Sequence, residues 1–239
     1  MKLLSVGRYF GIPVFIHWTF SFMILFVTYV AILEGLTMKQ VIAFSLYLAC
    51  MFLCVVLHEY GHALMARRFG ISTHDILITP IGGLARLEGL PFDPKGELYI
   101  ALAGPVVNLV IAALLFSGFY LSGIGFLWPD LEEIDLMELI TNPIGFVHML
   151  LIVNIVLFVF NLVPAFPMDG GRVVRALLSY KMTRERATFY AAILGKILSI
   201  GFLVFATYNK MPSLFFISIF IFVMAGREYR MVKKIDRDY

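Results

Sequence analysis

The chain has 239 residues, of which 61% are hydrophobic and 15% are charged, and its mean hydropathy is +0.91. A soluble globular domain averages about 45–50% apolar and about 25% charged residues. The composition therefore excludes an ordinary soluble protein and indicates a polytopic membrane protein. The net charge is only +3, and no basic run is dense enough to predict nucleic acid as a partner.

Six apolar segments are predicted to cross the membrane, since about 20 apolar residues span a bilayer as a helix. They cover residues 13–33, 40–66, 97–121, 143–163, 187–208 and 213–226. The first follows a basic start, but its apolar part exceeds the roughly 7–15 residues of a cleaved signal core. We interpret it as a retained span and expect residues 1–239 to form a single domain.

Residues 72–92 do not have the pattern of a span. The run from His74 to Pro80 is typical of a strand, the glycines that follow indicate a turn, and an alternating pattern then resumes. We predict a small β-hairpin or sheet between the second and third spans of an otherwise all-α membrane protein. The alternatives are a plain cytoplasmic connector, or an edge strand that pairs with an extended substrate.

The distribution of charge predicts the orientation. Lys and Arg precede the first span, end the second, separate the fourth from the fifth and follow the sixth. The loop at 122–142 has no basic residue but contains Asp130, Glu132, Glu133, Asp135 and Glu138. Because basic residues favour the cytoplasmic side, we expect a multi-pass cell-membrane protein with both termini in the cytoplasm.

The second span contains the motif His58-Glu59-Tyr60-Gly61-His62. Residues four apart lie on one face of a helix, so His58 and His62 can bind one metal ion. Glu59 is then placed to act on a metal-bound water. The predicted topology puts this motif in the cytoplasmic half of the bilayer, which indicates hydrolysis of a substrate that itself lies in the membrane.

A catalytic zinc usually has three protein ligands and an open position for water. The best candidate for the third ligand is Asp169, because the prolines before it end the fourth span and the two glycines after it let the backbone turn. The alternative for this Asp-Gly-Gly is a turn with a helix N-cap. We predict one Zn²⁺ per chain, bound by His58, His62 and Asp169.

Other polar residues in the apolar segments are open to two interpretations. Asn161 is a candidate donor to the oxyanion, or else makes an interhelical hydrogen bond, and Asn108 has the same ambiguity. Cys54 is expected to pack, with an accessory metal role left open, and Arg175 is among the basic residues expected to contact lipid head groups. The remaining histidines, expected to have structural roles, are His17, His74 and His148.

Taken together, the motifs resemble the site-2 protease family of intramembrane zinc metalloproteases. Besides the two motifs above, the likeness includes the segments from Gly11 to Trp18, from Pro80 to Arg86 and from Ala103 to Asn108. It is greatest to the compact six-span bacterial and archaeal branch. Many members there carry C-terminal nucleotide-sensing domains, and we expect none within a sequence that ends at Tyr239.

The resemblance implies regulated intramembrane proteolysis of a single-span membrane protein, with lipid as the surrounding partner. It also supports Glu59 as the acid/base and Asn161 as the oxyanion donor. Two alternatives remain: a zinc hydrolase of lipids or small esters, and a non-enzymatic metal transporter. The presence of Glu59 and the lack of a polar stripe through several spans argue against the transporter. No motif indicates an oligomeric state.

Overall fold

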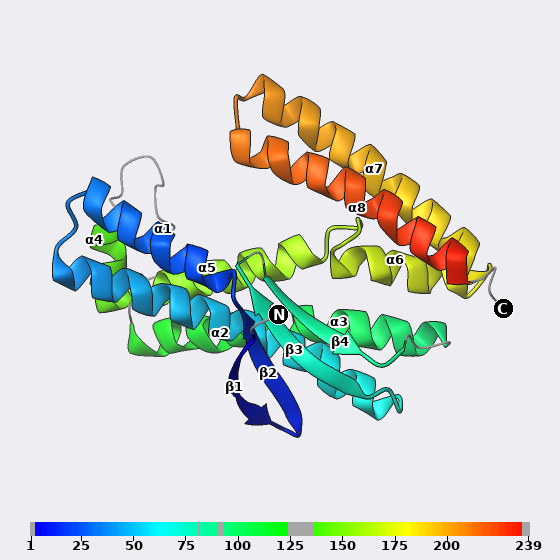
Figure 1. Ribbon diagram of the computed structural model, residues 1–239, viewed down its shortest axis with the longest axis horizontal. Helices are drawn as coiled ribbons and strands as arrows, with labels where there is room; N and C mark the ends of the chain where they lie inside the picture. Colours follow the sequence, from blue (N-terminus) through cyan, green and yellow to red (C-terminus); the bar gives the residue numbers. More distant parts are fainter. Residues whose placement is uncertain (1–2, 81, 90–92, 124–135, 236–239) are drawn as a thin grey trace. The chain divides into compact units, whose positions relative to one another are not determined.

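The computed structural model describes residues 3–80, 82–89, 93–123 and 136–235 of the chain. The chain forms two compact units (Figure 1). The first unit comprises Met1–Gly89 and Val106–Phe158, and the second comprises Leu90–Pro105 and Val159–Tyr239. The helices α3 (Pro94–Ser122) and α5 (Pro143–Asn161) each contribute residues to both units.

The first unit contains a four-stranded sheet in the order β1-β2-β3-β4. The strands are β1 (Leu3–Tyr9), β2 (Ile12–His17), β3 (Thr73–Thr79) and β4 (Gly82–Leu87). The central pair, β2 and β3, is parallel and the two outer pairs are antiparallel. Parallel strands need a long crossover connection, here made by α1 (Phe20–Leu33) and α2 (Met38–Arg68) (Figure 1). The predicted β element is therefore confirmed, but it is only half of a sheet that the N-terminus completes.

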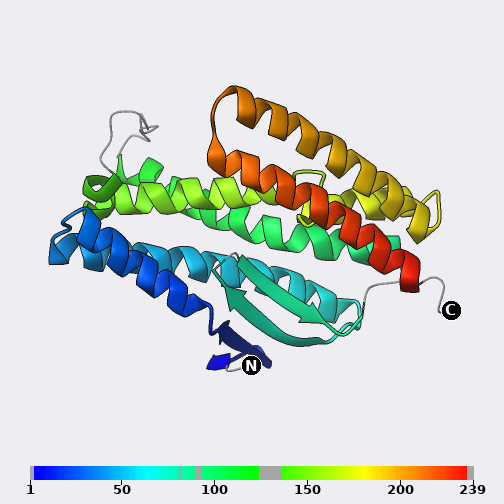
Figure 2. The same ribbon diagram turned by 45° about the horizontal axis from the view of Figure 1, so that its top comes forward.

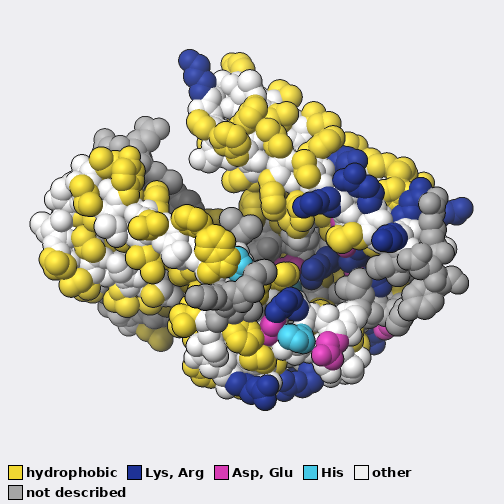
Figure 3. All heavy atoms as spheres, viewed as in Figure 1, with side chains coloured by type: hydrophobic (Ala, Val, Ile, Leu, Met, Phe, Trp, Pro, Cys, Tyr) yellow, Lys and Arg dark blue, Asp and Glu magenta, His cyan; other side chains and the backbone are white. Residues whose placement is uncertain are grey.

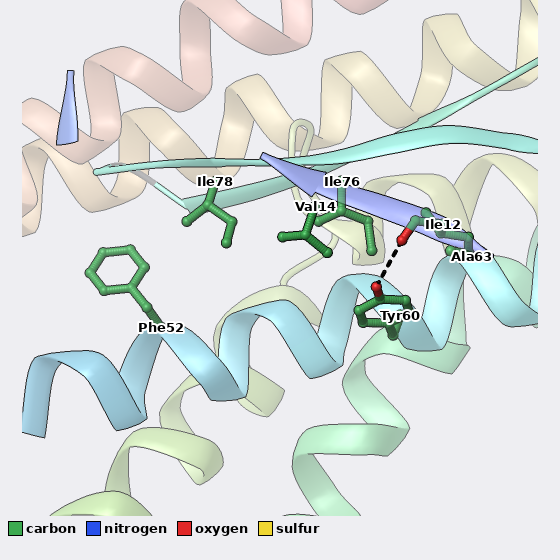
Figure 4. Packing of buried hydrophobic residues seen from close by; sticks show 7 residues of the cluster. All are labelled: Ile12, Val14, Phe52, Tyr60, Ala63, Ile76 and Ile78. Atoms are coloured by element: carbon green, nitrogen blue, oxygen red, sulfur yellow. Dashed lines mark hydrogen bonds between the residues drawn. The ribbon is translucent and has the colours of Figure 1, made fainter. Parts of the chain in front are cut away.

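One face of this sheet packs on α2. Successive side chains of a strand point to opposite faces, so alternate residues of β2 and β3 share the buried side. The cluster comprises Ile12, Val14, Ile76 and Ile78 of the strands and Phe52, Tyr60 and Ala63 of α2 (Figure 4). The Tyr60 hydroxyl also donates to the Ile12 carbonyl at 3.2 Å. The sheet thus fixes the rotation of the helix that carries the two motif histidines.

Both ends of α2 have favourable local chemistry. Thr37 and Gln40 form a capping box, in which each side chain accepts from the other residue's backbone N–H. Arg67 and Arg68 lie in the last turn, where positive charge is favoured by the helix dipole. At 31 residues, α2 is longer than the roughly 20 residues that a bilayer core requires.

Within the described residues, four helices are long and apolar enough to cross a membrane: α2, α3, α5 and α7 (Arg184–Tyr208). They correspond to the second to fifth predicted spans. The chain also contains α4 (Leu136–Thr141), α6 (Asp169–Ser179) and α8 (Pro212–Ile235). Hydrophobic side chains cover much of the visible surface of α7 and α8 (Figure 3), as expected for helices that face lipid.

The two outermost predicted spans differ from the structure. Residues 13–17 belong to β2, so the prediction of a helix over 13–33 is wrong for its first part. The β-branched residues Ile12, Val14 and Ile16 alternate along this strand, a pattern that favours a pleated sheet. The remaining helix, α1, has 14 residues. The last helix, α8, continues past residue 226 through a charged stretch to Ile235.

In the second unit, α7 and α8 form an antiparallel hairpin whose helices lie side by side in both views (Figure 2). Small buried residues allow this close approach. Ala191 and Ala192 of α7 and Ala225 of α8 pack together with Phe166. The preceding helix, α6, packs against α7.

Some predictions fall outside the described residues. They concern Ile81 and residues 90–92 of the β-like segment, and four acidic residues of the loop at 122–142. These loop residues are Asp130, Glu132, Glu133 and Asp135. The predicted orientation remains a prediction.

Candidate metal centre

The two motif histidines lie one turn apart on α2 and face each other. Their Nε2 atoms are 3.0 Å apart, and the side chains of His58 and His62 are 5% and 4% exposed. Two nitrogens that each lie about 2.0–2.1 Å from a tetrahedral zinc are about 3.3 Å apart. The observed spacing therefore fits a shared ion after a shift of a few tenths of an ångström. Imidazole nitrogen is also a ligand that zinc prefers.

Two buried asparagines lie behind His58 in the first unit. The Nδ1 atom of His58 is 2.6 Å from Oδ1 of Asn108 on α3. The Nδ2 group of Asn108 donates in turn to Oδ1 of Asn154 on α5, at 3.0 Å. Both asparagines are 0% exposed. Asn108 is thus positioned to orient His58 as a metal ligand. No sequence pattern predicts a role for Asn154.

Glu59 lies beside β4. Its Oε2 accepts a hydrogen bond from the backbone N–H of Ala85 at 2.8 Å. A Cβ atom at Gly83 would lie 2.6 Å from Cγ of Glu59, so the strand can approach this closely only with glycine at that position. This contact explains one glycine of the Pro-x-Gly-Gly segment and ties β4 to the predicted acid/base.

Asp169 and Asn161 belong to the second unit. Asp169 is the first residue of α6 and is 6% exposed, and a carboxylate there is favoured by the helix dipole. A Cβ at Gly170 would lie 2.2 Å from the Val163 carbonyl oxygen, so the chain before α6 folds tightly against its first turn. Asn161 is the half-buried last residue of α5. The zinc-ligand role of Asp169 and the oxyanion role of Asn161 stay predictions.

A cluster of buried ion pairs links α6 to α3 and α8. The guanidinium of Arg175, which is 1% exposed, donates to Glu97 of α3 at 2.7 Å and to Glu228 of α8 at 2.6 Å. It also lies 5.1 Å from the ring centroid of Phe166, in the segment before Asp169. The expectation that Arg175 contacts lipid head groups is therefore wrong. The cause is that its two acidic partners are distant in sequence, and no local pattern announces them.

The other histidines have partners nearby in the sequence, and Cys54 has one on α5. The histidine contacts are Thr19 for His17, Asp75 for His74 and the Ile144 carbonyl for His148. The thiol of Cys54 accepts from Nδ2 of Asn154 at 3.3 Å. These contacts agree with structural roles for the four residues.

Comparison with known proteins places the chain in a family. The model for peptidase family M50 matches residues 46–203. A zinc metalloprotease of Methanocaldococcus jannaschii is 34% identical over 224 residues, which are 93% of this chain and 59% of that protein. The stage IV sporulation protein FB of Bacillus subtilis is 26% identical over 141 residues, which are 59% of this chain and 43% of that protein.

The solved structure of a site-2 protease from Methanocaldococcus jannaschii matches with a TM-score of 0.62 and 31% identity, covering 95% of each chain. The chain therefore belongs to peptidase family M50, the family of the site-2 proteases. It spans about three fifths of the length of the archaeal zinc metalloprotease and less of the sporulation protein.

Proposed function

We propose that this protein is a zinc-dependent intramembrane protease, which hydrolyses a peptide bond within or near the transmembrane segment of a membrane protein. The observation that carries the proposal is the pair of buried imidazoles, 3.0 Å apart at Nε2, on a helix long and apolar enough to cross a membrane. The names of the M. jannaschii relatives, zinc metalloprotease and site-2 protease, support both the metal and the chemistry.

His58, His62 and Asp169 are the proposed zinc ligands, and all three are buried. Two imidazoles and a carboxylate are a typical set for a catalytic zinc, which keeps its fourth position open. A buried carboxylate also needs a cation or hydrogen bonds to compensate its charge. When bound, zinc would lower the pKa of water towards about 7 and polarise the scissile carbonyl.

The remaining steps fall to protein groups. Glu59 takes a proton from the attacking water and delivers it to the leaving nitrogen. Its hydrogen bond to the Ala85 N–H holds the carboxylate against β4. Asn161 donates a hydrogen bond to the oxyanion as it forms. Because β4 is an outer strand of the described sheet, its free edge offers backbone pairing to a locally unwound substrate.

The finer placement in the membrane is part of the same proposal. Six spans, with α1 and α8 added to the four candidate spans, put both termini in the cytoplasm and the metal in the cytoplasmic half of the bilayer. Residues 1–239 then act as one membrane domain. A single-span protein, locally unwound, is the proposed substrate, and lipid is the surrounding partner.

The proposal is tested with zinc-loaded protein in proteoliposomes and a panel of single-span membrane peptides. Wild type, Glu59→Gln and the control Glu88→Gln are compared at matched zinc content. Glu88 is an exposed residue just after β4, so its substitution removes the same charge away from the two histidines. We expect cleavage within the span by wild type and by Glu88→Gln, and none by Glu59→Gln.

Equal cleavage by Glu59→Gln would contradict the role of Glu59. Release of fatty acid from the vesicles without peptide cleavage would favour a lipid hydrolase. Zinc flux that is unchanged in Glu59→Gln would favour a transporter, because ion passage does not require an acid/base at that position.

A further inference from the structure

The side chain of Asn154 has only one possible orientation. Its Nδ2 lies 2.8 Å from the carbonyl oxygen of Leu150, one turn earlier on α5. A backbone carbonyl can only accept a hydrogen bond, so the donor end of the amide must face it. The same Nδ2 group directs a hydrogen bond to Cys54 Sγ at 3.3 Å. The acceptor Oδ1 of Asn154 is consequently turned towards α3.

The orientation of Asn154 determines that of Asn108, which in turn determines which nitrogen of His58 is protonated. Because Asn154 presents Oδ1, Asn108 must present Nδ2 to it, at 3.0 Å. The Oδ1 of Asn108 is then left to face Nδ1 of His58, at 2.6 Å. An amide oxygen accepts only, so Nδ1 carries the proton. The Nε2 of His58 keeps its lone pair and points towards Nε2 of His62.

We propose that Asn154 is a positioning residue that, through Asn108, holds His58 in the tautomer protonated at Nδ1, so that Nε2 is available to the metal. The inference rests on the proposed function, since it assumes that the histidine pair binds zinc. Neither asparagine touches the metal or the substrate in this role. The chain of hydrogen bonds starts at the Leu150 carbonyl, which can only accept, and ends at His58, whose tautomer it determines.

The fixed end matters because an amide has no intrinsic direction. The two ends of an asparagine side chain have nearly the same shape, so Asn108 could rotate by half a turn at little steric cost. Its Nδ2 would then face Nδ1 of His58 and force that nitrogen to accept. The proton would move to Nε2 and block the metal. Asn154 prevents this rotation by offering only an acceptor to Asn108.

Two substitutions separate this role from simple helix packing. Asn154→Leu keeps the approximate volume but removes the acceptor that orients Asn108. Asn108→Asp places an ionised carboxylate beside His58, which accepts from Nδ1 in either orientation. The double variant should therefore hold the correct tautomer without Asn154. A lost packing contact would not be restored by a change on another helix.

The measurements are zinc affinity by chelator competition and the His58 tautomer by ¹⁵N NMR of the zinc-free protein. We expect Asn154→Leu to lose about 10–100-fold in affinity and to shift His58 towards protonation at Nε2. The double variant should regain the Nδ1 tautomer and come within about threefold of Asn108→Asp alone. Thr188→Val is the control, because Thr188 is a buried residue that also donates to the carbonyl four residues earlier. It should change neither reading.

Unchanged zinc affinity or an unchanged tautomer in Asn154→Leu would overturn the inference, as would a double variant that binds no better than Asn154→Leu. The tautomer is read without zinc and without substrate. A protein that shows the predicted tautomers and zinc affinities but cuts no membrane peptide would contradict the proposed function and leave the role of Asn154 intact.

Discussion

Each unit has a buried polar network that spans several helices, and the two networks are stabilised by different means. In the first unit, a chain of neutral amides, Asn154 and Asn108, leads to His58. In the second, a cluster of charges links Arg175 on α6 to Glu97 and Glu228 on two other helices. Both satisfy buried hydrogen-bonding groups, which an apolar environment requires. They differ in whether they can determine which atom carries a proton.

A neutral chain fixes which atom carries a proton, because each amide has one donating and one accepting end. It does so without placing charge in the apolar part of a helix, where charge is costly. The charged cluster cannot define a tautomer, but it joins three helices through one planar guanidinium. Glu97 lies in the first turn of α3, and Glu228 follows the apolar part of α8. The charges thus lie at the ends of apolar stretches, where their cost is lower.

The largest predicted effect comes from breaking the charged cluster. Arg175→Met should lower the free energy of unfolding by about 3–5 kcal/mol, because two carboxylates lose a buried partner. Thermal unfolding in detergent measures it. Arg172→Met is the control, since Arg172 is a half-buried arginine of the same helix outside the cluster.

A triple variant tests the cause of this loss. Arg175→Met combined with Glu97→Leu and Glu228→Leu replaces Arg175 and its two carboxylate partners by apolar groups, a change that often restores stability. Arg184, whose Nη2 lies 3.4 Å from Oε2 of Glu97 and whose side chain is 23% exposed, stays in place. We expect the triple variant to be more stable than Arg175→Met alone. A triple variant that unfolds below the single one would show that the unpaired carboxylates are not the cause of the loss in Arg175→Met.

The next effect concerns the tight segment before α6. Gly170→Ala places a Cβ 2.2 Å from the Val163 carbonyl oxygen and 2.4 Å from that of Leu162. Backbone must move, so we expect a loss of about 1–3 kcal/mol, together with lower zinc affinity if Asp169 is a ligand. Gly118→Ala on α3, whose Cβ would meet no described atom within 4 Å beyond its own helix backbone and chain neighbours, should not destabilise the protein, since alanine is the better helix former. Equal unfolding temperatures for the two variants would contradict the tight turn.

In the first unit, the contact between β4 and Glu59 can be altered without touching a zinc ligand. Gly83→Ala puts a Cβ 2.6 Å from Glu59 Cγ, so the carboxylate must move. We expect kcat for peptide cleavage to fall about 10–100-fold, since small displacements of a catalytic group are costly. Zinc affinity should stay at the wild-type value. A parallel loss of zinc would show that β4 supports the histidines rather than Glu59.

Local sequence patterns predict the helix that carries the metal motif. They do not predict contacts between segments that are distant in the sequence. The spacing of His58 and His62 on an apolar helix is a period-four signal, and it predicts their Nε2 atoms correctly as neighbours. The sequence shows glycine at positions 83 and 170 but not why glycine is needed there. Other residues approach the backbone too closely for a Cβ atom, and the sequence pattern does not identify those residues. Asn154 and Glu97 gave no local signal because their partners are remote in sequence.

The N-terminal error has a related cause. Residues 13–33 are mostly apolar and include no Asp, Glu, Lys or Arg, and hydropathy alone does not distinguish a buried strand from a membrane helix. The strand forms because β3, some 60 residues later, pairs with β2 at Val14 and Ile16. The alternating β-branched residues of Ile12–His17 favour a strand, but the length of the apolar run favours a membrane helix.

The smallest effect concerns an ion pair between a buried carboxylate and an arginine that is 45% exposed. The Arg86 guanidinium of β4 donates to Asp75 of β3, and this bond, with a smaller contribution from His74, lowers the pKa of the carboxyl below its ordinary 3.8 against the opposing effect of burial. A lowered pKa stabilises the fold above about pH 3.8, and the contribution is lost as pH falls through the folded value. Because the Arg86 side chain is 45% exposed, solvent screening limits the contribution to about 1 kcal/mol or less. Asp75→Asn should therefore flatten the acid limb of the unfolding curve slightly, and an identical limb in both proteins would show that the pair contributes nothing to stability.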